Sequence, residues 1–310
     1  MTPFLTLFTA PKPFTDPHID VIQRNALQSW KRLGSDVTVV MIGDEAGMAN
    51  VAAELGVLHI WDVLCNEFGT PLVSSIFNKA RQCSPTPLLA YVNADILLMP
   101  DFLEAARQMA ALAERFLIVG QRWDLDMHDA MDFSDGWDER LRARIRAEGY
   151  LHPPAGSDYF IFPRDCFIEI PDFAIGRSMW DNWMIFHALK QGWVTVDASP
   201  TIQIVHMRHD YGHLPNGRNR NRVPEALQNI RLAGGRRRSM YLIDVPWTIK
   251  DGQLRPSQWS WARFKRSIET FPVLKMDSNF LAEVSFAICH PINYIGEWQG
   301  RLMYKWRQIG

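Results

Sequence analysis

The chain has 310 residues, of which 47% are hydrophobic and 22% charged, with a formal net charge of −1. This composition excludes a disordered polymer, and the near-neutral charge argues against a protein whose whole surface binds nucleic acid. A chain of this length can bury one large core, with or without an appended unit.

Alternating strands and helices are predicted over the first 120 residues. Apolar runs typical of buried strands lie at residues 4–8, 37–42, 57–60, 88–92 and 116–119. Helical spacing occurs between them at residues 17–34, 49–55, 71–82 and 101–115, and Asp16 followed by Pro17 marks the start of the first helix. The pattern predicts a mostly parallel central sheet covered by helices on both faces, with ligands binding at the edge where the strands end.

After Gly120 the predicted loops become longer. A strand is expected at residues 159–162, helices at 139–148 and 180–191, and two further strands at 194–197 and 201–206. Beyond His213 the sequence is basic, with helical patterns at residues 224–233 and 261–271. We therefore predict one α/β domain over residues 1–213 and a basic, mainly helical C-terminal extension over residues 214–310.

Cysteine usage and the N-terminal sequence favour a reducing compartment. The four cysteines form no CxxC pair and show no zinc-ligand spacing. The first residues lack the pattern of a secretory signal, and no window approaches the roughly 18 apolar residues of a membrane span. We expect a soluble, cytoplasmic protein, with peripheral contact at the inner face of the membrane as an open alternative.

Residues with binding chemistry follow three of the predicted strands. They are Thr9, Ala10 and Pro11 after the first strand, Asp44 and Glu45 after the second, and Asn93 and Asp95 after the fourth. The first group can pack against a base, and the second can accept hydrogen bonds from ribose hydroxyls or a base N–H. Ionised Asp95 can ligate Mg²⁺ or Mn²⁺ through oxygen, although a turn or helix-cap role is the alternative.

Histidines and two further aspartates complete the candidate site. His206 and His209 follow the strand at residues 201–206, and a neutral imidazole is a competent Mn²⁺ ligand. Asp158 precedes another strand, and Asp181 starts a helix between two tryptophans. Indole rings desolvate a carboxylate and raise its pKa toward that of a general base, whereas a helix N-terminus lowers it. A purely helix-stabilising Asp181 is the alternative.

Five strings in this sequence, VNADILLMPDF, VGQRWDLD, LHPPAGSDYFIFPR, IGRSMWDNWM and HMRHDY, resemble a group of poorly characterised bacterial glycosyltransferases of the GT-A fold. The resemblance covers about residues 3–213. It implies a single Rossmann-like GT-A domain, with a donor half over residues 1–120 and an acceptor half over residues 121–213. Asp95 matches the second acid of the Asp-x-Asp metal motif, whose first acid is Asn93 here. Asp181 matches the base-bearing motif, and His206 the late metal-binding histidine.

The resemblance further implies a reaction. A hexosyltransferase would move a sugar from a nucleotide-diphosphate donor, with UDP-sugars favoured, to a hydroxyl of a glycan, a lipid-linked molecule or a small molecule. Mn²⁺ or Mg²⁺ on Asp95 and His206 would stabilise the departing diphosphate, and Lys79, Arg122 or Arg177 would add a cation. Asp181, with Asp158 as the second candidate, would deprotonate the acceptor if the reaction inverts configuration. Such enzymes build polysaccharides and glycoconjugates.

Three alternatives stay open at this point. A sugar nucleotidyltransferase also needs a nucleotide pocket and a metal, but usually has a glycine-rich loop where Thr9-Ala10-Pro11 stands. A non-catalytic carbohydrate-binding protein with a decayed site is compatible with Asn93. The basic C-terminal region, with residues 236–238 and 259–266, is compatible with contact to an anionic membrane, with a homodimer interface or with an ordinary helix face.

Overall fold

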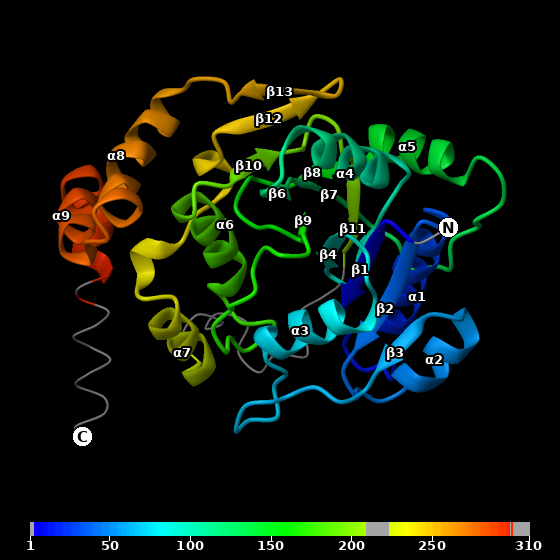
Figure 1. Ribbon diagram of the computed structural model, residues 1–310. Coiled ribbons are helices and arrows are strands. Elements are labelled where there is room, and N and C mark those ends of the chain that lie inside the picture. The colour runs from blue at the N-terminus through cyan, green and yellow to red at the C-terminus, as the bar shows by residue number, and fades with distance from the viewer. Residues whose placement is uncertain (1–2, 209–222, 298, 300–310) are drawn as a thin grey trace.

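A nine-stranded sheet lies at the centre of the computed structural model, which describes residues 3–208, 223–297 and 299 (Figure 1). The strands of this sheet are β1 (Leu5–Thr9), β2 (Val37–Ile42), β3 (Leu58–Ile60), β4 (Leu88–Val92), β6 (Phe116–Val119), β9 (Tyr159–Pro163), β10 (Val194–Asp197), β12 (Trp247–Lys250) and β13 (Gln253–Pro256). Their spatial order is β13-β12-β10-β6-β9-β4-β1-β2-β3. The predicted strands of the central sheet are all present.

The central sheet is mostly parallel, as the sequence predicts, with one reversed strand in its middle and one at an edge. Strands β4, β1, β2 and β3 pair in parallel, as do β6, β10 and β12. Between these two parallel groups, β9 runs antiparallel to both β4 and β6, and β13 is antiparallel at one edge. Because β9 runs in the opposite direction, it begins at the edge where β4 and β6 end.

Helices cover both faces of the sheet, as the sequence predicts. They are α1 (Pro17–Lys31), α2 (Met48–Leu55), α3 (Val73–Cys83), α4 (Asp101–Leu112), α5 (Trp137–Glu148), α6 (Trp180–Lys190), α7 (Pro224–Leu232), α8 (Trp261–Lys275) and α9 (Asn279–Cys289). Apolar residues of α1, α2, α4 and α5 form the core on one face, and those of α3, α6 and α8 form the core on the other. Strand β1 contributes to both cores, with Leu5 and Leu7 on one side and Phe8 on the other.

A second, four-stranded sheet lies beside the end of the central one. It comprises β5 (Ile96–Leu97), β7 (Arg122–Leu125), β8 (Tyr150–Leu151) and β11 (Ile204–Met207), in the order β5-β11-β7-β8. The sequence predicts β11, as part of the longer run 201–206, but not β5, β7 or β8, whose two to four residues show no periodicity of their own. The pairing places His206 beside Ile96 on one side and Asp124 on the other.

The C-terminal segment contributes strands as well as helices. After α7, the hairpin β12–β13 joins the central sheet through parallel pairing of β12 with β10. The expected boundary near Leu214 falls outside the described residues. Within the part of the chain that is described, no helix combines the length and the apolar content needed to cross a membrane.

Candidate functional site

Polar side chains meet where β4 and β11 end and β9 begins. Asn93 follows β4, and its backbone N–H donates to the Asp158 carbonyl at 2.9 Å. The Asn93 side chain also donates, through Nδ2, to Asp158 Oδ1 at 2.9 Å, while Tyr91 donates its hydroxyl to Asn93 Oδ1 at 3.1 Å. The orientation of the Asn93 amide is therefore determined from both sides.

Arg122 is the cation at the centre of this cluster. Its Nη1 donates to both oxygens of Asp158, at 2.8 and 2.9 Å, and its Nε donates to Asp124 Oδ1 at 3.1 Å. The Asp158 side chain is 7% exposed, so its charge is balanced within the protein. Arg122 was predicted as a phosphate contact, and the structure also gives it a role in holding two buried carboxylates.

Asp95 and His206 face each other beside this cluster. His206 Nε2 lies 3.6 Å from Asp95 Oδ2, and the other ring nitrogen, Nδ1, lies 2.9 Å from Asp124 Oδ1. The Met207 N–H donates to the Asp95 carbonyl at 3.1 Å, which fixes the loop after β4 against β11. Burial lowers the pKa of His206, but the Asp95 carboxylate outweighs burial and raises the pKa above its ordinary value.

Asp124 and His152 are site residues that the sequence analysis missed. The side chain of Asp124 is only 12% exposed, and its Oδ2 lies 2.8 Å from His152 Nδ1. Burial opposes its ionisation, but the hydrogen bond from His152 and the charge of Arg122 hold the pKa of Asp124 below its ordinary value. The sequence feature that could have predicted a role for Asp124 is its spacing of two residues from Arg122, which puts both side chains on one face of a strand.

Asp181 is the second residue of α6 and is half-buried. Its Oδ1 atom is buried and has no hydrogen-bond partner among the described residues. Trp180 packs edge-on against Tyr91, with ring centroids 5.1 Å apart, and helps to exclude water. Burial raises the pKa of Asp181 from 3.8 to about 6, and the nearby charge of Asp158 adds to the rise. The rise in the pKa of Asp181 caused by desolvation is therefore larger than the lowering caused by the N-terminus of α6.

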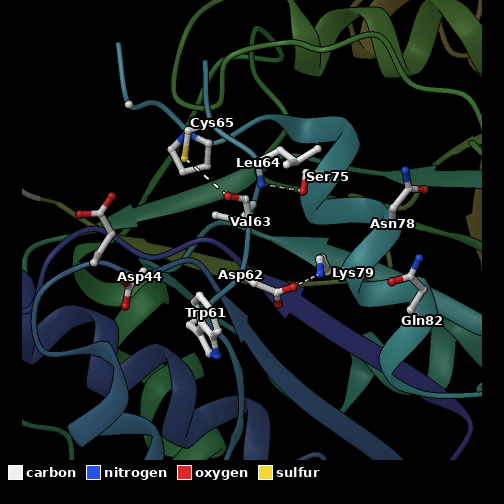
Figure 2. Close-up of a pocket in the computed structure, with 13 residues that line it drawn as sticks. Asp44, Trp61, Asp62, Val63, Leu64, Cys65, Ser75, Asn78, Lys79 and Gln82 are labelled. Atoms are coloured by element: carbon white, nitrogen blue, oxygen red, sulfur yellow. Dashed lines mark hydrogen bonds and ion pairs between the residues drawn. The ribbon is translucent and has the colours of Figure 1, made fainter. Parts of the chain in front are cut away.

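A cavity of about 710 Å³ lies beyond the ends of β2 and β3. Its lining comprises Asp44, Glu45, Trp61, Asp62, Val63, Leu64, Cys65, Gly69, Pro71, Ser75, Asn78, Lys79 and Gln82. Figure 2 shows Asp44 across the cavity from Lys79, which forms an ion pair with Asp62. Trp61 is 66% exposed, so one aromatic ring is available for stacking at this site.

The cavity and the Asp95 cluster occupy neighbouring parts of the same sheet edge. Strand β1 lies between β2 and β4, and adjacent strands are about 4.8 Å apart, so the ends of β2 and β4 are separated by roughly 10 Å. The turn after β1 exposes little surface: Thr9 and Pro11 are buried and Ala10 is partly exposed. The Thr9 hydroxyl is buried with no hydrogen-bond partner in the described structure.

The residues present fit a divalent metal that arrives with a phosphate. Among the described residues, no group of three or more His, Cys, Asp or Glu side chains is placed to hold a metal ion. His209, the other predicted ligand, lies outside them. However, Mg²⁺ commonly takes only one or two protein ligands and completes its shell with substrate phosphates and water. Asp95 and His206 can supply such a pair.

Comparison with known proteins gives little guidance. No family model and no curated protein matches the sequence. Among solved structures, the mannosyltransferase PcManGT from Pyrobaculum calidifontis, in complex with GDP-Man and Mn²⁺, aligns at 11% identity with a TM-score of 0.42, over 68% of this chain and 59% of that chain. The alignment thus spans less than two thirds of the mannosyltransferase. A similarity this distant assigns neither a fold family nor an activity to the chain.

Proposed function

We propose that the chain is a glycosyltransferase that moves a sugar from a nucleotide-diphosphate donor to a hydroxyl acceptor. The observation that supports it best is the facing pair Asp95 and His206, 3.6 Å apart, at the sheet edge that also borders the cavity. A metal and phosphate site beside a nucleotide-sized pocket is what this chemistry requires. UDP-sugars are the first donors to test.

The cavity would receive the nucleoside. Asp44 and Glu45 line it and would accept hydrogen bonds from the ribose or the base, whereas Thr9, Ala10 and Pro11 are not among the residues that line it. The spacing of roughly 10 Å between the ends of β2 and β4 is of the scale of a nucleoside diphosphate. Lys79, which lines the opposite wall and pairs with Asp62, would place a cation beside the bound nucleotide.

Asp95 and His206 would hold Mn²⁺ or Mg²⁺. When bound, the ion would neutralise charge that develops on the departing diphosphate. Asp124 would keep His206 in the tautomer whose Nε2 is available as a ligand, because a carboxylate at Nδ1 retains the proton there. Asn93, in the place of a first acid, is oriented by Tyr91 and Asp158 and can donate or accept a hydrogen bond at the donor sugar or a bound water.

Asp181 would be the general base of an inverting reaction. With a pKa of about 6 it is mostly ionised at neutral pH, yet more basic than an ordinary aspartate, and it would accept the proton of the attacking hydroxyl. Asp158 was the other candidate base. Because both of its oxygens accept hydrogen bonds from Arg122, we assign it to positioning Arg122 and Asn93.

A thermal-shift panel of UDP, GDP, CDP and ADP, each with and without Mn²⁺, tests the proposal. A nucleotide at about a hundred times its dissociation constant should stabilise the fold by about 2.7 kcal/mol. We expect one nucleotide to stabilise the protein only with Mn²⁺, and its sugar conjugate to be turned over. Asp95→Ala should abolish both effects, whereas Asp126→Ala, a nearby acid that is 68% exposed, should retain them. Absence of any shift in the wild-type protein would refute the proposal.

A further inference from the structure

Helices α8 and α9 expose an ordered row of large apolar side chains. On α8 these are Trp261, Phe264, Ile268 and Phe271, and on α9 they are Phe280, Val284 and Ile288. We call these seven side chains the α8–α9 stripe. The exposed fractions reach 68% at Trp261 and 76% at Phe280. Spacings of three and four residues put the members on α8 along one face of that helix, and likewise those on α9.

The stripe is distinct from the packed faces of the same helices. Val273 of α8 and Ala282 of α9 are fully buried and belong to the core beneath the central sheet. Single exposed apolar side chains are ordinary, but seven of them on two helices that pack against each other mark an interaction surface. Trp259 before α8, and Ile292 and Ile295 in the helical residues 291–297, extend the exposed apolar surface. Figure 1 shows α8 and α9 at one end of the molecule, far from β3 and α2.

The acidic side chains of this region are all paired with cations. Glu269 lies 2.6 Å from His290 and 3.2 Å from Arg266, and it is nearly fully buried. Glu283 and Glu297 both pair with Arg237, at 3.1 and 2.8 Å. Asp277 is exposed but pairs with Lys190 and Arg238. Arg237 and Arg238, for which the sequence left a membrane contact open as one of three alternatives, hold these carboxylates.

Basic side chains are left on the exposed side. Lys275 continues the row on α8, four residues after Phe271, and is exposed without an ion pair in the described structure. Lys265, on the same helix, is half-buried beside His290, with Nζ 3.5 Å from Nδ1. Among the described residues, Lys275 therefore places an unpaired positive charge at the end of the apolar row on α8.

We propose that the α8–α9 stripe docks on an anionic lipid bilayer, with its apolar side chains at the boundary between headgroups and acyl chains. Aromatic and aliphatic residues on one helix face, bordered by lysine, are the features that an interfacial helix uses. A second copy of the chain fits less well, because the described carboxylates of this region are already paired with cations and none is left to meet Lys275. This inference is independent of the proposed glycosyl transfer.

Vesicle sedimentation of the full chain tests the proposal. Equimolar phosphatidylcholine and phosphatidylglycerol vesicles should bind the protein at low salt, whereas phosphatidylcholine alone should bind far less, and high salt should weaken the binding. The double variant Phe271→Gln, Ile288→Gln should lower the partition coefficient roughly tenfold or more, since burying one such side chain is worth at least that factor. The matched control Leu58→Gln, Leu112→Gln removes two comparably exposed leucines elsewhere and should bind as the wild type does.

A charge variant and a mass measurement separate the alternatives. Lys275→Glu should weaken binding to the anionic vesicles several-fold at low salt and leave the melting temperature unchanged, because the side chain is exposed. Sedimentation equilibrium should give the same mass for the wild type and the double variant. Undiminished vesicle binding by the double variant would overturn the proposal. So would a wild-type dimer that fails to bind vesicles and that the double variant converts to a monomer.

Discussion

Replacing Asp181 with asparagine should stabilise the fold at neutral pH while removing the proposed base. The carboxylate is held in a desolvated position, and its pKa is about 6 instead of 3.8. Because the folded-state pKa is the higher one, the folded protein binds more protons than the unfolded chain between these values. Stability therefore falls as the pH rises from about 4 to about 6 and loses no more above that window. Asparagine does not titrate, so the Asp181→Asn variant does not lose this part of the free energy of unfolding as the pH rises.

The size of the effect follows from the shift in pKa. Each pKa unit corresponds to about 1.4 kcal/mol, so a rise from 3.8 to about 6 gives roughly 3 kcal/mol. This is an upper limit because Asp181 is only half-buried and solvent screens its charge. The Asp181→Asn variant should match the wild type near pH 4 and exceed it by up to that amount above pH 6.

Urea denaturation at a series of pH values from 4 to 8 measures this difference directly. Asp138→Asn is the matched control, because Asp138 is also the second residue of a helix and also follows a tryptophan. It should lose only the favourable charge–dipole interaction, a few tenths of a kcal/mol, with no gain at high pH. An Asp181→Asn variant that is less stable than the wild type at pH 8 would show that the carboxylate is not desolvated, and the argument for a general base would fail with it.

Two further substitutions probe the supporting structure. Asp124→Asn removes the carboxylate at His206 Nδ1 and should weaken Mn²⁺-dependent nucleotide binding about 10–100-fold by calorimetry. Gly120→Ala should cost about 1–3 kcal/mol in urea denaturation, because its Cβ would lie 2.4 Å from the Tyr159 hydroxyl and 3.2 Å from Ser199 N. Adding Tyr159→Phe should recover most of that loss, since the hydroxyl has no hydrogen-bond partner in the described part of the chain.

The strands of the central sheet were predictable because they are buried on both faces. Val37–Ile42, Leu88–Val92, Phe116–Val119 and Val194–Asp197 match the apolar runs residue for residue. A strand covered by helices on both sides needs no polar residue, so it stands out as a continuous apolar segment between helical patterns. The start of α1 was equally clear, since Asp16 Oδ1 accepts hydrogen bonds from the N–H groups of His18 and Ile19.

Short strands and hairpins were missed for a different reason. The strands β5, β7 and β8 form because they pair with strands far away in the sequence. Segments of two to four residues contain no local pattern that predicts such pairing. The hairpin β12–β13 did carry a signal, the dipeptide Asp251-Gly252, whose φ angles of 53° and 70° suit a tight hairpin turn. The two strands are exposed and partly charged, so neither forms the continuous apolar run by which the buried strands were recognised.

The antiparallel direction of β9 explains why the sequence identified candidate site residues but did not predict which of them are in contact. In a wholly parallel sheet, the residue after the end of β9 would lie at the ligand edge, and that residue is Arg164. Because β9 runs the other way, Asp158 occupies this edge instead, between Asn93 and Arg122. The Asp158 carboxylate accepts hydrogen bonds from Asn93, after β4, and from Arg122, in β7. Arg122 in turn donates to Asp124, whose carboxylate contacts His206. The direction of one strand thus turns scattered polar residues into a continuous network, and that direction is a property of tertiary pairing that no local pattern encodes.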